Sequence, residues 1–84
     1  MNYILTQHAR DALLKRKISI AWLERVLQFP MRTDPDENDT ELEHRLAVIA
    51  EHGKSGATVV VNTKAFPRRI MTAYFDRNFH YALH

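Results

Sequence analysis

The side chains best suited to chemistry in this sequence are a histidine, a tyrosine and several cations. His8 and Tyr74 can exchange protons, and arginine or lysine can neutralise charge that develops on a phosphate. Attack of a ribose 2′-hydroxyl on the adjacent phosphate needs a base for the hydroxyl proton, an acid for the leaving 5′-oxygen, and cations around the phosphate. These residue types therefore suit a ribonuclease that needs no metal ion.

We assign roles to these groups as hypotheses. The expected catalytic residues are His8, Arg45, Arg69 and Tyr74. The expected RNA-binding residues are Arg16, Lys64, Arg68 and Arg77. Arg16 is also a candidate for stabilising the phosphate. Phe66, which lies between Lys64 and Arg68 in the sequence, is a candidate for stacking on a base. Simpler interpretations stay open, because such side chains often serve only helix capping, sheet packing or solubility.

Composition argues against most other classes of site. The chain has no cysteine, which excludes a disulfide framework, thiolate zinc sites and a cysteine nucleophile. No phosphate loop, dinucleotide-binding glycine pattern, HExxH motif or nucleophile elbow occurs. His80 and His84 have the spacing of a metal-binding pair but lack a third ligand. We therefore expect neither a metal nor a cofactor.

Length and charge set the frame for these residues. A chain of 84 residues forms one domain, here 1–84, with a modest core, so a site is expected on an open face. Basic residues predominate in 1–33 and 52–84, whereas 34–51 carries seven acids and one arginine. The sequence shows neither a signal-peptide pattern nor an apolar run long enough for a membrane span. We expect a cytoplasmic protein without membrane contact.

Two helices are predicted in the first third of the chain. Thr6 is a suitable N-cap for a helix over 7–17. Ser19 is a suitable N-cap for a second helix, which Pro30 ends near residue 29. Together they predict a helical hairpin.

The period of the pattern then changes to two, which predicts strands over 41–51, 57–63 and 70–76. A helix remains an alternative for 41–51. Residues 34–39 and 52–56 are predicted as loops from their Pro, Gly, Asn and Asp content. The fold class is therefore α+β, with two N-terminal helices packed on an antiparallel β-sheet of three to four strands; short edge strands are placed at 2–5 and 31–33.

Alternation along each strand predicts which side chains face the helices. The inward set is Leu42, His44, Leu46, Val48, Val59, Val61, Thr63, Met71, Ala73 and Phe75. His44 is thus expected to be a partly buried structural histidine. Arg45 and Tyr74 are expected to share the open face of the sheet.

The segment HARDALLKRKISIAWLERVLQFP resembles the opening of a family of small bacterial domains of unknown function. The matching positions are His8, Ala9, Arg16, Ile18, Ser19 and Pro30, and Thr72 and Tyr74 in IMTAYFD match the last strand. That family is similar in its helix–helix–sheet layout to the RelE and BrnT toxins, small ribonucleases that cut RNA without a metal. The resemblance implies a RelE-like fold, RNA as substrate and a cognate antitoxin.

Two other classes of function remain open beside a toxin-like RNA endonuclease. One is a non-enzymatic module that binds nucleic acid or protein and keeps the basic surface without convergent His and Tyr side chains. The other is a structural interaction domain that uses the acidic segment 34–51. The structural interaction domain should show no salt-sensitive RNA binding, which separates it from the endonuclease and the nucleic-acid-binding module.

Overall fold

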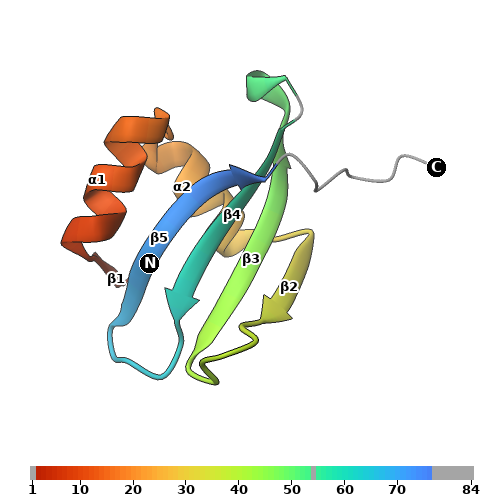
Figure 1. The fold of residues 1–84 in the computed structure, drawn as a ribbon. Helices are drawn as coiled ribbons and strands as arrows, with labels where there is room; N and C mark the ends of the chain where they lie inside the picture. The colour runs from red at the N-terminus through yellow and green to blue at the C-terminus, as the bar shows by residue number, and fades with distance from the viewer. Residues whose placement is uncertain (1, 54, 77–84) are drawn as a thin grey trace.

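Two α-helices, a short 3-10 helix and five strands make up residues 2–53 and 55–76, the part of the chain that the computed structural model describes (Figure 1). In chain order these elements are β1 (Tyr3–Leu5), α1 (Gln7–Arg16), α2 (Ile20–Gln28), β2 (Arg32–Pro35), β3 (Leu42–Ile49), η1 (Ala50–His52), β4 (Ser55–Asn62) and β5 (Arg68–Asp76). No helix within these ranges has the length and apolar character to cross a membrane.

The helix boundaries follow from local capping. The Thr6 hydroxyl accepts a hydrogen bond from the Ala9 amide (3.1 Å), and the Ser19 hydroxyl accepts one from the Trp22 amide (3.1 Å). Each satisfies a backbone donor that the first helical turn leaves unpaired. Lys17 ends α1 in the left-handed conformation, at φ 57°. Both predicted N-caps are confirmed.

The sheet is mixed and five-stranded, with the order β1-β5-β4-β3-β2. β3, β4 and β5 form the expected antiparallel meander, and β2 pairs antiparallel with β3. β1 instead pairs parallel with β5, so that Tyr3 lies opposite Arg68 and Leu5 opposite Ile70. The short edge strands predicted at 2–5 and 31–33 are present as β1 and β2, but the prediction of a fully antiparallel sheet of three to four strands is wrong. A strand of three residues carries no signal for the direction of its pairing, and its partner is distant in sequence.

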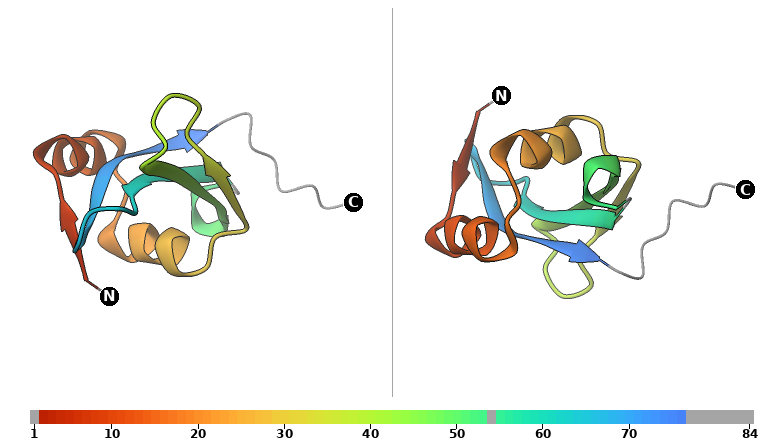
Figure 2. Two further views of the ribbon diagram at one scale, coloured as in Figure 1. Left: turned by 90° about the horizontal axis from the view of Figure 1, so that it is seen from below. Right: turned by 90° about the horizontal axis from the view of Figure 1, so that it is seen from above.

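The core fills the space between the helices and one face of the sheet. α2 lies across β3 and β4, and α1 lies along β5 (Figure 2). The fully buried side chains there include Leu23 and Val26 from α2, Ile49 from β3 and Val59 from β4. On the opposite face, the loop between β2 and β3 rises beside the sheet (Figure 2). No helix among the described residues lies across that face.

The predicted faces hold for β4 but not for β3. Ala47 pairs with Ala57 and Ile49 with Ser55, and both Ala47 and Ile49 belong to the buried core. Leu42 and His44, which alternate with them, therefore face the open side. Alternation was a poor guide here because β3 carries apolar residues on both faces.

An irregularity in β5 also changes a predicted face. Val60 pairs with Thr72 whereas Val61 pairs with Ile70, so Met71 is an extra residue in the ladder. Ile70 is fully buried, and Met71 lies among the residues of the open side. The inward orientation predicted for Met71 is wrong, because the bulge shifts the alternation by one residue.

Candidate functional site

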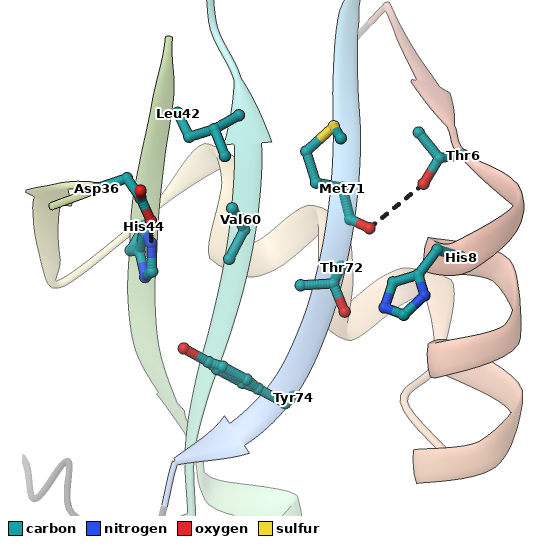
Figure 3. A pocket seen from close by; sticks show the side chains of 9 residues that line it. All are labelled: Thr6, His8, Asp36, Leu42, His44, Val60, Met71, Thr72 and Tyr74. Atoms are coloured by element: carbon teal, nitrogen blue, oxygen red, sulfur yellow. Dashed lines mark hydrogen bonds and ion pairs between the residues drawn. The ribbon is translucent and has the colours of Figure 1, made fainter. Parts of the chain in front are cut away.

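An open groove lies on the face of the sheet opposite the core and encloses about 540 Å³ (Figure 3). We call it the open-face groove. Its lining comes from the start of α1, the β2–β3 loop and the three central strands: Thr6, His8, Asp36, Leu42, His44, Val60, Met71, Thr72 and Tyr74. Apolar side chains form much of its surface, and the proton-exchanging side chains are His8, His44 and Tyr74.

Strand register brings the wall residues together. His44 on β3 pairs with Val60 on β4, which pairs with Thr72 on β5, so these three side chains form one row across the groove. The bulge places Met71 beside Thr72 on the same face. Tyr74 follows two residues later and extends its hydroxyl across β4 toward the side where His44 lies (Figure 3).

One wall of the groove is held by a hydrogen bond between His44 and Asp36. His44 Nε2 lies 2.7 Å from Asp36 Oδ1, and both side chains are about a quarter exposed, at 27% and 22%. Asp36 also accepts hydrogen bonds from the backbone amides of Asn38 and Asp39, each at 3.0 Å. The His44 hydrogen bond, followed by these amides, lowers the pKa of Asp36 below its ordinary value. The carboxylate thus stays charged and orients the His44 ring.

The opposite wall carries His8, which is exposed in the first turn of α1. This helix start is fixed to β5 through Thr6. The Thr6 amide donates to the Ile70 carbonyl (3.2 Å), and the Thr6 hydroxyl donates to the same carbonyl (2.9 Å). His8 therefore has a defined position relative to Thr72 and Tyr74, although the residues are far apart in sequence.

Arg45 lies on the other side of the sheet from Tyr74, and the expectation that the two share the open face is wrong. Arg45 pairs with the buried Val59 and has only 13% of its side chain exposed. Its Nη1 donates to the Leu27 carbonyl (2.8 Å), and its Nε donates to Glu43 (2.6 Å). Arg45 joins the end of α2 to β3, which is a structural arrangement and leaves the groove without this cation.

The remaining predicted cations that the structure describes also lie outside the lining of the groove. Arg69 pairs with Asn62, which pairs with the groove residue Leu42, so Arg69 is on the open face at the end of the groove. Lys64 is exposed in the β4–β5 turn, and Arg68 is exposed at the start of β5. Arg16 is exposed at the last turn of α1, about 12 Å along the helix from His8. Arg77 lies outside the described residues, as do His80 and His84.

The sequence interpretation missed the two residues that form the best-defined pair of the groove. The sequence pattern predicts that His44 faces the core, and it predicts Asp36 only as part of the loop 34–39. Asp34 pairs with His44 across the β2–β3 connection, and Asp36 comes two residues later, where the chain turns back. The sequence signal for this pair is a histidine and an aspartate on either side of the loop that joins two antiparallel strands. Within 2–53 and 55–76, no group of three or more His, Asp or Glu could hold a metal ion.

A comparison with protein families matches residues 5–75 to the model described as "Domain of unknown function (DUF4258)". This segment contains every residue that lines the open-face groove. No curated protein and no solved structure matches the chain.

Proposed function

The chain belongs to the DUF4258 family of domains of unknown function, and we propose that it is a toxin-like, metal-independent RNA endonuclease acting in the open-face groove. The observation that carries the proposal is the presence of His8 and His44 on opposite walls of one open groove, with Tyr74 between them. Cleavage by a ribose 2′-hydroxyl needs a base on one side of the phosphate and an acid on the other. Two histidines facing across a groove supply that pair.

In the proposed mechanism His44 is the base. The Asp36 carboxylate accepts a hydrogen bond from Nε2–H of His44. Neutral His44 therefore carries its proton on Nε2, and its Nδ1 is free to accept another proton. Nδ1 takes the proton of the 2′-hydroxyl, and the 2′-oxygen attacks the phosphorus. The Asp36 carboxylate stabilises the imidazolium that forms, as an orienting carboxylate does in other proton relays.

His8 is the acid of the same step. When protonated it gives its proton to the 5′-oxygen as the bond between phosphorus and that oxygen breaks. The products are a 2′,3′-cyclic phosphate and a free 5′-hydroxyl. The Tyr74 and Thr72 hydroxyls serve as donors to the phosphate oxygens, and Arg69 supplies positive charge at the end of the groove. Arg45 has no part in this mechanism.

The toxin-type role is proposed from the sequence resemblance described above, which implies the helix–helix–sheet layout of the RelE and BrnT toxins. On this proposal the protein acts on RNA in the cytoplasm and has a cognate antitoxin. The antitoxin would cover the basic surface with acidic and apolar groups and so mask it from RNA.

The test is cleavage of a labelled single-stranded RNA in EDTA by the wild type and the variants His8→Ala, His44→Ala and Tyr74→Phe. We expect wild-type cleavage to 2′,3′-cyclic phosphate ends and a loss of about 100-fold or more in each histidine variant. His52→Ala is the matched control, because His52 lies on η1 outside the groove. Circular dichroism verifies the fold of each variant. Absence of cleavage of both free RNA and ribosome-bound messenger RNA would reject the proposal.

A second function, a non-enzymatic nucleic-acid or protein-binding module, is favoured by one observation. The structure describes four predicted cations that are exposed, and none of them lines the groove. They are Arg16, Lys64, Arg68 and Arg69. A binding module predicts salt-dependent RNA binding that His8→Ala and His44→Ala leave unchanged, with intact RNA recovered.

A further inference from the structure

The β4–β5 turn, residues 63–67, carries the most exposed large apolar side chain of the described residues. Phe66 is 99% exposed, whereas the next, Leu14, is 81% exposed. One exposed apolar side chain needs no explanation by itself. Two further features of this turn, its rigidity and its charge, distinguish Phe66 from the others.

The first feature is that the turn is fixed by hydrogen bonds. The Asn62 Oδ1 accepts from the amides of Lys64 (3.0 Å) and Ala65 (3.1 Å). The Thr63 amide donates to the Glu41 carbonyl (3.1 Å), which attaches the turn to the segment before β3. The backbone that carries Phe66 is therefore ordered before any ligand arrives, which lowers the entropic cost of binding.

The second feature is positive charge next to the ring. Lys64 precedes Phe66 by two residues, and Arg68 and Arg69 follow it. Within the described part of the chain none of these three cations forms an ion pair, whereas Arg25 and Arg45 are paired with Glu51 and Glu43. Phe66 and Arg68 also line one hollow of about 370 Å³. An aromatic ring and unpaired cations lie together on an ordered turn.

We propose that this turn binds single-stranded RNA, with one base stacked on Phe66 and the neighbouring phosphates held by Lys64 and Arg68. Every base has a face that can stack on an aromatic ring, and the backbone between bases offers the negative charge. A duplex hides its base faces, so the site selects unpaired RNA. The choice of RNA as ligand rests on the proposed function.

The turn lies at the end of the open-face groove. Arg69 pairs with Asn62, and Asn62 pairs with Leu42, which lines the groove. This row of side chains joins the Phe66 turn to the open-face groove. An RNA strand that anchors a base at Phe66 can pass Arg69 and present a phosphate between His8 and His44. The turn then sets which nucleotide is cut, at a fixed offset from the stacked base.

The test measures binding separately from cleavage. A short 2′-O-methyl oligoribonucleotide lacks the attacking hydroxyl and cannot be cleaved, and 2-aminopurine in place of one base reports stacking. We expect Phe66→Ala to weaken binding about 10-fold, within the range for one base stacked on an aromatic ring, and Phe66→Trp to retain it. Arg68→Gln should lower the slope of log affinity against log salt concentration by about the amount that one phosphate contact contributes. Phe29→Ala is the matched control, since Phe29 is 72% exposed at the end of α2.

The outcomes separate this inference from the proposed function. Loss of oligonucleotide binding in Phe66→Ala, with Phe29→Ala unchanged, supports the site even when wild-type protein leaves cleavable RNA intact. Equal binding by the wild type and Phe66→Ala overturns it even when RNA is cleaved. No binding of the oligonucleotide by the wild type also overturns it. Loss of binding to anionic lipid vesicles in Phe66→Ala, with RNA binding unchanged, assigns the turn to a membrane surface instead and overturns the proposal.

Discussion

Asp36 and His44 form a hydrogen-bonded pair of 2.7 Å that ties the β2–β3 loop to the face of β3 beside the open-face groove. The pair gives the groove a charged carboxylate that does not itself need to contact RNA. It also fixes which ring nitrogen of His44 is free.

Replacing Asp36 tests this positioning role. In the proposed nuclease, Asp36→Asn keeps an acceptor for the His44 Nε2 proton but removes the charge that stabilises the imidazolium. We expect a lower kcat with little change in KM, and a smaller loss than in His44→Ala. Asp39→Asn is the control, because its carboxylate lies in the same loop and accepts a hydrogen bond from the Glu41 amide instead of contacting His44. An equal loss of kcat in both variants would indicate a general effect of the loop.

Stability in acid follows from the lowered pKa of Asp36. Because the folded-state pKa is below the unfolded value, about 3.9, the pair contributes stability above that pH. This contribution is lost as the pH falls through the folded-state pKa. We expect wild type to be more stable than Asp36→Asn at neutral pH and the difference to shrink below about pH 4. Urea unfolding followed by circular dichroism at several pH values measures it; a difference that is constant with pH would contradict the assignment.

Arg45 is expected to act on stability and not on chemistry. Arg45→Met leaves the Leu27 carbonyl and the partly buried Glu43 carboxylate without their donor, at a cost of about 2 kcal/mol in the free energy of unfolding. The double variant Glu43→Gln/Arg45→Met should recover part of this loss, because no unpaired charge remains. RNA cleavage by the folded fraction should equal that of the wild type. A large loss of kcat with unchanged stability would restore Arg45 to the catalytic set.

Thr6 links the capping of α1 to the position of His8. Thr6→Ala removes the cap on Ala9 and the hydroxyl bond to Ile70, so we expect a loss of about 1 kcal/mol in stability. Cleavage should fall as well, because the first turn of α1 carries His8. Thr6→Ser keeps the hydroxyl and should restore both properties. Ser19→Ala, which removes the corresponding cap of α2, should reduce stability while leaving cleavage intact.

The parts of the fold that sequence predicts well have local causes. Thr6 and Ser19 are caps because of their own hydroxyls, and Pro30 follows the end of α2 because proline cannot continue a helix. The face of β4 is predicted correctly because Val59 and Val61 share one side of the strand, whereas the other side carries the polar Thr58 and Asn62 beside Val60. All of these signals lie within a few residues of the feature that they predict.

The parts that sequence misses depend on pairing between distant strands. Leu42, Leu46 and Val48 made one face of β3 look like the core side, whereas the pairing with β4 selects the face of Ala47 and Ile49. The extra residue in β5 has no sequence marker. The groove lies on the face opposite the core. When the wrong face of β3 is assigned to the core, Arg45 is therefore predicted on the groove side and His44 is predicted in the core.

The parallel pairing of β1 with β5 has a consequence for the newly made chain. The Thr6 hydroxyl that anchors α1 bonds to a carbonyl 64 residues later, and β1 has no strand beside it until β5 is present. During translation, the helices and the β2–β3–β4 hairpins leave the ribosome before the strand that carries Thr72 and Tyr74. Contacts so distant in sequence form late in folding. A nascent chain therefore lacks the groove while it is being synthesised, and a ribosome making this protein is not exposed to its proposed activity until the last strand has emerged.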